Sequence, residues 1–314
     1  MSKLHFRTDR RWLWLLPLLV AVCALAACNR VLTDDENYAF IVTVDMRQYA
    51  GPEFESSQYF QGTCEAIRDV GKGAFMISPG DIDPPWDVRY TLDKVLGTDY
   101  LWYPVVGNHE VETPDDMAWL RDWGREAIPN LVRKGPPNGE ETTYSFDYQN
   151  THFVVLNQYY DGNSDTGTNG DITDPLYEWL KADLEANTKP LAFIFGHEPI
   201  VSIPDADNGR HRHEDSCLNA YPENNHRFHA LLLEHDVTAF FCGHTHGYSA
   251  ALINGLWQID AGHARGLGDK GARSTFLRVR VDGNNVSVDV YRDDASGGPY
   301  QLTRTVVLDC GGSS

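Results

Sequence analysis

The sequence predicts an α/β domain with a ligand site at the carboxyl ends of its strands. Short apolar runs flanked by turn residues recur along the chain, which is typical of buried strands. Helical patterns separate several of these runs, and this alternation is typical of α/β domains. Five of the runs end directly on polar residues, at the position where α/β sheets bind their ligands.

Six apolar runs are the candidate strands. Each is five or six residues long and is rich in Val, Ile, Phe or Leu. They cover residues 39–44, 74–78, 101–106, 152–156, 191–195 and 237–241. From Tyr248 onward the chain changes to strand-like segments separated by NG, DG and GG turns, so further strands are expected there.

Two helices have clear patterns. The first is expected to have Asp174 as N-cap, because Pro175 then occupies the first helical position. Its apolar face would consist of Leu176, Trp179, Leu180 and Leu184. The second is expected to run from about Asn224. Two long polar loops, 158–173 and 202–222, are candidates for functional segments.

The first 27 residues have the pattern of an export signal. A basic start precedes an apolar run, Trp12 to Ala27, that is short for a membrane span and ends in small residues. The segment LAAC before residue 29 resembles the lipobox of bacterial lipoproteins, whose cysteine carries lipid after cleavage. The alternative is a plain secretory signal. We expect export and anchoring through Cys28 in the cell envelope, in the outer membrane because Asn29 is not the retention aspartate of such lipoproteins.

One large domain is expected after the signal. Residues 28–37 are polar and would form a tether, residues 38–310 the domain and residues 311–314 a tail. Beyond Cys28 the chain keeps Cys64, Cys217, Cys242 and Cys310. These allow three complete disulfide pairings, among which the sequence does not choose. Cys242 lies in the run VTAFFC and can equally be a buried small side chain.

The chain is acidic, with a formal net charge of −19. Such a charge repels nucleic acid phosphates, so no nucleic-acid partner is expected and the membrane is contacted through the lipid only. It would also repel an anionic substrate unless bound cations reverse the sign locally. The charge therefore favours a metal site.

Several strand-like runs end on side chains that bind metals. The residues are Asp45 after IVTV, Asp81 in SPGD, Asn108 and His109 in GNHE, His197 in IFGHEP, and His244 and His246 in GHTH. Carboxylates and imidazoles suit Fe, Mn or Zn, and a shared carboxylate can hold two ions that clamp one phosphate. Each motif alone can be a cap or a turn, but GNHE and GHTH together indicate a metal site.

In these blocks and their order, the sequence resembles the calcineurin-like metallophosphoesterase superfamily. The resemblance spans residues 39 to about 263 and implies a four-layer α/β/β/α sandwich with two mixed β-sheets and a dinuclear site. It implies that Asp81 bridges both metals. Asn108, His197 and His244 would complete one metal site, and Asp45 and His246 would serve the other.

The resemblance also implies a hydrolytic mechanism. A metal-activated hydroxide would attack phosphorus in line, and the cations would stabilise the developing charge. His109, which lies outside the metal ligands, would orient the phosphate or protonate the leaving oxygen. The substrate would be a phosphate monoester or diester.

One block departs from the family pattern. The family's DxH motif has a histidine where this chain has Arg47, and a guanidinium has no lone pair to give a metal. The GDxxY tyrosine of purple acid phosphatases would fall at Pro84. The first metal therefore loses a ligand, and either the metal is weak or absent, or another residue replaces that ligand. The candidate replacements are Gln48, His211 and His213.

Arg47 itself can also supply positive charge. In a strand, residues 45 and 47 face the same way, so Arg47 is expected to contact bound phosphate. The alternative is an ion pair with Asp45 or Asp83. A different class of function, a lipid-anchored protein that binds a ligand without catalysis, is open for the same reason. The retained His109 favours catalysis.

Other polar residues have weaker signals. Loop residues Tyr159, Tyr160, His211 and His213 are candidates for shaping a substrate pocket. His263, in DAGHARG, is expected either to approach the site or to have a structural hydrogen-bonding role.

Overall fold

The computed structural model describes residues 37–126 and 128–308, which belong to one compact unit, Glu36–Ser314. The predicted signal peptide, the predicted lipidation site Cys28, the predicted tether up to residue 36, Cys310 and the tail lie outside the described residues. None of the helices in the described ranges has the length and hydropathy needed to cross a membrane.

The first sheet has six strands. Its order is β13 (Gln301–Leu308), β12 (Asn285–Arg292), β11 (Thr275–Asp282), β1 (Asn37–Val42), β2 (Phe75–Ser78) and β3 (Leu101–Pro104). Strands β1, β2 and β3 are parallel to one another, whereas β11, β12 and β13 add to β1 in antiparallel fashion. The sheet is therefore mixed, and the carboxyl ends of its three parallel strands lie at the same edge.

The second sheet has seven strands. Its order is β4 (Leu131–Lys134), β5 (Tyr144–Tyr148), β6 (Thr151–Val155), β7 (Leu191–Phe195), β8 (Ala239–Cys242), β10 (Leu256–Ala261) and β9 (Tyr248–Ile253). Strands β6, β7, β8 and β10 are parallel, and the outer strands are antiparallel.

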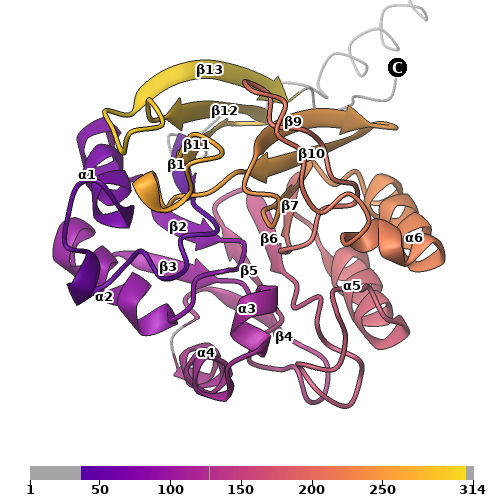
Figure 1. The fold of residues 1–314 in the computed structure, drawn as a ribbon. Helices are drawn as coiled ribbons and strands as arrows, with labels where there is room; N and C mark the ends of the chain where they lie inside the picture. The colour runs from indigo at the N-terminus through magenta and orange to yellow at the C-terminus, as the bar shows by residue number, and fades with distance from the viewer. Residues whose placement is uncertain (1–36, 127, 309–314) are drawn as a thin grey trace, which may run out of the picture. The chain divides into compact units, whose positions relative to one another are not determined.

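Helices cover the outer face of each sheet (Figure 1). The helices are α1 (Phe60–Val70), α2 (Pro85–Leu96), α3 (Asn108–Val111), α4 (Pro114–Glu126), α5 (Asp174–Ala186) and α6 (Pro222–Glu234), with short 3-10 turns η2 (Pro52–Phe54), η3 (Leu218–Ala220) and η4 (Gly266–Gly268). One apolar cluster joins α1, α2 and α4 to the first sheet, and another joins α5 and α6 to the second.

A third apolar cluster fills the space between the two sheets. Phe40 of the first sheet lies edge-on to Phe153 of the second, with ring centroids 5.3 Å apart, and Tyr103 stacks on Phe146 at 3.8 Å. Aromatic pairs of this kind contribute to stability beyond their buried area. The two sheets therefore face each other between helical layers, and the predicted four-layer fold with two mixed sheets is confirmed.

The predicted elements are present with small shifts in their bounds. Each of the six candidate strands corresponds to one of β1, β2, β3, β6, β7 and β8. The helix expected to be capped by Asp174 begins at Asp174, with Thr173 as its N-cap. Cys64, Cys217 and Cys242 are free and buried, so Cys242 packs as a small side chain in β8.

Candidate metal centre

The predicted site residues follow the carboxyl ends of strands in both sheets. Asp45 and Asp81 each lie three residues beyond their strands, β1 and β2, and Asn108 begins α3 after β3. His197 follows β7, and His244 follows β8. Because these strands are parallel within each sheet, their loops meet at one end of the sandwich.

Two glycines let these loops approach closely. Gly80 has a φ of +91°, and a Cβ there would lie 2.6 Å from the His197 ring. A Cβ on Gly107 would lie 2.3 Å from the backbone nitrogen of Asp81. Any larger residue would push the loops apart, so the glycines of the GD and GNH blocks are steric requirements of the site.

Glu110 joins the same two loops through hydrogen bonds. Its buried carboxylate accepts the backbone N–H groups of Gly107 (2.6 Å), Asp81 (3.0 Å) and Ile82 (2.7 Å). Backbone donors at this depth need acceptors, because an unpaired one is costly. The fourth residue of GNHE therefore fixes the position of Asp81 relative to Asn108.

We expect Glu110→Gln to lower the free energy of unfolding by about 2 kcal/mol. The amide would place an N–H₂ group against a backbone N–H in a buried position. Urea denaturation of the variant measures the change. Glu185→Gln, at an exposed position on α5, is the matched control and should change the stability little. An unaltered midpoint for Glu110→Gln would contradict this structural role.

Four predicted ligands form a tight cluster. The Asn108 Oδ1 atom lies 3.0 Å from His197 Nε2 and 3.1 Å from His244 Nδ1, and the two imidazole nitrogens are 3.2 Å apart. Asp81 Oδ1 lies 3.4 Å from His197 Nε2. Asp81, His197 and His244 are buried, and Asn108 is partly buried. The predicted grouping of Asp81, Asn108, His197 and His244 is therefore present.

The two histidines of this cluster are neutral and direct lone pairs into it. Burial lowers the pKa of His197, and burial together with His197 lowers the pKa of His244 to about 2. His197 Nδ1 donates to the Pro79 carbonyl at 2.8 Å, so its Nε2 carries the lone pair. Three lone-pair atoms about 3 Å apart repel one another unless a cation lies between them. This cluster, which we call the main metal cluster, fits a metal ion.

Asp45 and His246 form a second group beside it. Asp45 Oδ2 accepts the His244 backbone N–H at 2.9 Å, and Asp45 Oδ1 lies 3.5 Å from His246 Nε2 without a hydrogen bond. Burial and the nearby Asp81 raise the pKa of Asp45 well above its usual value. The same His246 nitrogen lies 3.2 Å from Nη2 of Arg265, a residue that the sequence did not single out.

His109 lies beside the main metal cluster. Its backbone N–H donates to Asp81 Oδ1 at 3.2 Å, its Nε2 is 3.7 Å from Asp81 Oδ2, and its Nδ1 is 3.0 Å from Glu112. The ring is a quarter exposed, in contrast to the buried ligands. It is placed to meet a substrate rather than to hold the ion.

A pocket of about 240 Å³ opens next to the main metal cluster. Its lining includes Asn108, Glu112, Tyr159, Asn169, Ser216 and His244. Both long loops therefore contribute to it. Of the loop residues predicted to shape a pocket, Tyr159 lines it and His213 stacks on His244 at 4.0 Å, whereas Tyr160 bonds to the Pro137 carbonyl and His211 to the Ser202 carbonyl.

A family model described as calcineurin-like phosphoesterase matches residues 24–248. The chain belongs to this family. The resemblance predicted from the ordered motifs is confirmed, and the predicted class of enzyme, a metallophosphoesterase, is the class that this family model describes.

Individual relatives are more distant. Purple acid phosphatase 21 of Arabidopsis thaliana is 28% identical over 200 residues, which cover 59% of this chain and 40% of that protein. The solved structure of PhoD has a TM-score of 0.61 at 12% identity and covers 88% of this chain and 70% of that chain. GAP50, the anchor in the inner membrane complex of Plasmodium, has a TM-score of 0.54 at 13% identity and covers 87% and 88%. The two structures support the fold alone.

Calcineurin-like phosphoesterases use divalent or trivalent metal ions, and the residues of this chain fit them unequally. The main metal cluster supplies two imidazole nitrogens, an amide oxygen and a carboxylate, a set that suits Fe, Mn or Zn. The group of Asp45 and His246 lacks the DxH histidine, and the guanidinium of Arg265 lies against its remaining imidazole. One site fits a metal, and the other does not.

The residue in place of that histidine, Arg47, faces another acid. Its Nε lies 3.1 Å from Asp83 Oδ1, which is the ion pair considered as the alternative from the sequence. Strand β1 ends at Val42, and Asp45 has a φ of +54°, so the strand alternation expected to aim Arg47 at the site is wrong. Contact between Arg47 and a phosphate stays a prediction.

The three candidate replacement ligands also lie elsewhere. Gln48 is exposed, His211 bonds to the Ser202 carbonyl, and His213 packs on His244 in the main metal cluster. His263 is buried, with its Nε2 3.2 Å from the Ala272 carbonyl and its Nδ1 accepting the Arg265 backbone N–H. His263 thus has the structural role that the sequence left open.

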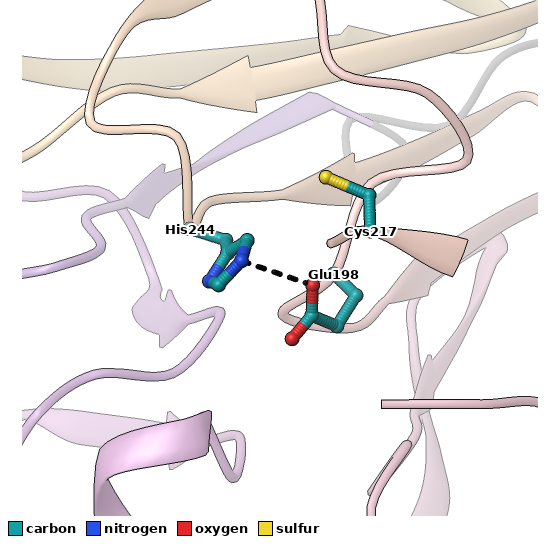
Figure 2. A group of neighbouring side chains, drawn as sticks. All are labelled: Glu198, Cys217 and His244. Atoms are coloured by element: carbon teal, nitrogen blue, oxygen red, sulfur yellow. Dashed lines mark ion pairs between the residues drawn. The ribbon is translucent and has the colours of Figure 1, made fainter. Parts of the chain in front are cut away.

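Glu198, which the sequence did not single out, supports a metal ligand from behind. Figure 2 shows its carboxylate facing the His244 ring, with Oε2 3.3 Å from Nε2. Tyr159 donates to its other oxygen at 2.8 Å, and Gln158 accepts its backbone N–H. The two facing atoms are at ion-pair distance but make no hydrogen bond to each other. Because a carboxylate behind a ligand imidazole orients the ring in metal sites, we expect Glu198 to orient His244 when a metal is bound.

We expect Glu198→Ala to weaken metal binding about 10- to 100-fold while the fold persists. Without the carboxylate, the His244 ring can rotate and change tautomer. Titration of the metal-free variant with Zn²⁺ or Mn²⁺ in a calorimeter measures the effect. Glu185→Ala serves as the control for a lost carboxylate. Wild-type affinity in Glu198→Ala would show that the contact does not orient His244.

Proposed function

We propose that this chain hydrolyses phosphate monoesters or diesters at the main metal cluster. The observation that carries the proposal is the convergence of four side chains beside a pocket: Asp81, Asn108, His197 and His244. The ring of His109 lies next to them. A cation held by these residues would supply Lewis acidity for the hydrolysis. The remaining steps fall to the side chains around it.

His109 is the proposed general acid. Its partly exposed ring lies next to the pocket lined by Glu112, and Glu112 lies 3.0 Å from its Nδ1. The Nε2 of this ring is the nitrogen that would give a proton to the leaving oxygen. The hydrogen bond from the His109 backbone N–H to Asp81 Oδ1 helps to hold this donor beside the phosphoryl group.

Small phosphate esters are the proposed substrates. The formal charge of −19 opposes binding of nucleic acids, so we propose no nucleic-acid partner. Within the site the cation and nearby arginines reverse that charge locally, so an anionic ester can enter. Residues of both long loops line the pocket and would select the alcohol part of the ester.

The test is hydrolysis of aryl phosphate monoesters and diesters by the purified full chain. The protein is stripped of metal and reloaded with Mn²⁺, Zn²⁺ or iron. Hydrolysis that appears only after reloading supports the proposal. A protein that binds metal and inorganic phosphate but hydrolyses no ester would instead support the second function, a ligand-binding protein, which the loss of the DxH histidine at Arg47 favours.

We also propose, from the sequence pattern alone, that the chain is exported and anchored through lipid on Cys28. Replacement of Cys28 with serine should move the protein from the membrane to the soluble fraction on cell fractionation. Cys64→Ser, which alters a buried cysteine of the domain, is the control. Membrane association that survives Cys28→Ser would contradict the lipid anchor.

A further inference from the structure

We propose that the guanidinium of Arg265 takes the place of the first metal of the family and binds the phosphoryl group together with a single metal ion in the main metal cluster. The proposal deepens the proposed function, because it takes a phosphate ester as the ligand. It rests on the position of Arg265, on its unused hydrogen-bond donors and on the residues that surround it.

Arg265 is fixed next to the two residues left from the first metal site. Its Nε donates to the Asp45 carbonyl at 2.5 Å, and its Nη2 lies 3.2 Å from His246 Nε2. Its backbone N–H donates to His263 at 3.2 Å. Asp45, Asp81 and His197 have ligand atoms within 4.8 Å of one another and could hold a metal ion together. Arg265 lies beside this group through its hydrogen bond to Asp45.

The guanidinium has donors to spare. Of its five N–H groups, two have acceptors, and no residue in the described ranges accepts the other three. The side chain is only 8% exposed. Nη1 of Arg265 has no hydrogen-bond partner among the described residues and is not among the fully buried unpaired atoms, so a ligand can reach it. A phosphoryl group offers the paired oxygens that a guanidinium binds in bidentate fashion. The geometry therefore points to an anionic ligand.

The surroundings oppose a metal ion at the same place. His246 would have to give its Nε2 to the ion, but that nitrogen faces Arg265. On the other side of the His246 ring, Nδ1 lies 2.5 Å from Arg212 Nη1 and 2.6 Å from Asp269 Oδ2. A divalent ion so close to a permanent cation would be repelled.

Two further arginines increase the positive charge. Arg210 lies 2.9 Å and Arg212 lies 3.6 Å from Asp269, the carboxylate that contacts His246. Three arginines thus converge on this group, while Asp45 and Asp269 are the acids that face it. The alternative is that Arg265 only neutralises the buried Asp45, in which case it would not affect the binding of an added anion.

The first measurement is the metal content of the full chain after loading with excess Zn²⁺ or Mn²⁺ and removal of unbound ions. We expect one tightly bound ion per wild-type chain. Two ions per chain would overturn the proposal, because the first metal position would then be occupied. This count is independent of catalysis.

The second measurement is calorimetric binding of inorganic phosphate to the metal-loaded chain. Arg265→Gln should weaken phosphate binding about 10- to 100-fold with the metal content unchanged. Arg265→Lys keeps the charge but loses the planar fork and should fall in between. Arg125→Gln, an exposed arginine on α4, is the control and should bind like wild type.

Thermal unfolding checks that each variant is folded. If Arg265→Gln does not fold, the phosphate binding of Arg265→Lys decides the result. Unchanged phosphate binding in the folded Arg265 variants would overturn the proposal. Failure of the proposed function is a separate outcome: one metal and Arg265-dependent phosphate binding, with no ester hydrolysed, would leave this inference standing and reject catalysis.

Discussion

Replacing Asp81 with asparagine is expected to abolish tight metal binding and to lower kcat/KM by about three orders of magnitude. Asp81 is the only carboxylate of the main metal cluster, and its Oδ1 lies 3.4 Å from His197 Nε2. An amide supplies no negative charge to hold the ion among the neutral ligands, and the loss of the ion removes several kcal/mol of transition-state stabilisation.

The measurement combines metal content and steady-state hydrolysis of an aryl phosphate. Asp122→Asn, at an exposed position of α4, is the control and should keep both. If Asp81→Asn retained one metal ion and more than about a tenth of the wild-type rate, Asp81 would not be a ligand of the catalytic ion.

His109→Ala is expected to lower kcat about 10²- to 10⁴-fold without loss of metal. The ring is not among the contacts of the main metal cluster, and its Nε2 lies 3.7 Å from Asp81, so its removal takes away a proton donor and not a ligand. The loss should be large for alkyl phosphates and small for nitrophenyl phosphates, because a nitrophenolate leaves without a proton.

Comparison of the two leaving groups separates general acid catalysis from simple positioning. His226→Ala, an exposed histidine on α6, controls for the loss of an imidazole. An equal loss of rate for both esters would mean that His109 orients the phosphate without protonating the leaving group. A wild-type rate on both would remove His109 from the mechanism.

The metal ligands could be predicted from the sequence because each lies in a short block with its own local cause. The glycines of GD and GNH are required where loops touch, as at Gly80 and Gly107, and the ligand follows the glycine directly. The strands before these blocks are buried on both sides, so they read as continuous apolar runs. Local sequence thus carries both the fold signal and the site signal here.

Arg265 and Glu198 could not be found in this way. Arg265 contacts Asp45 across 220 residues, and Glu198 contacts His244 from another loop of the second sheet. Neither contact leaves a spacing pattern in the sequence. Glu198 is adjacent in sequence to His197, and this position next to a ligand histidine is the one feature of the sequence that could have indicated Glu198.

Some helices were also missed for local reasons. Helix α1 (Phe60–Val70) has no side-chain cap at Tyr59 and contains Gly62, which lowers helix propensity. Gly62 is present because a Cβ there would lie 1.8 Å from the Ser57 carbonyl oxygen. Packing against the loop before the helix therefore requires a glycine at residue 62, and this glycine weakens the helical pattern in the sequence.

The most direct test of a site built from one metal ion and one arginine is a stoichiometric titration. The metal-free full chain is titrated with Mn²⁺ or Zn²⁺, and the initial rate of aryl phosphate hydrolysis is recorded against equivalents added. The structure predicts a linear rise that stops at one equivalent. A rate that keeps rising to two equivalents would contradict it, whereas no hydrolysis at any amount of metal would contradict the proposed catalysis and not the one-metal site.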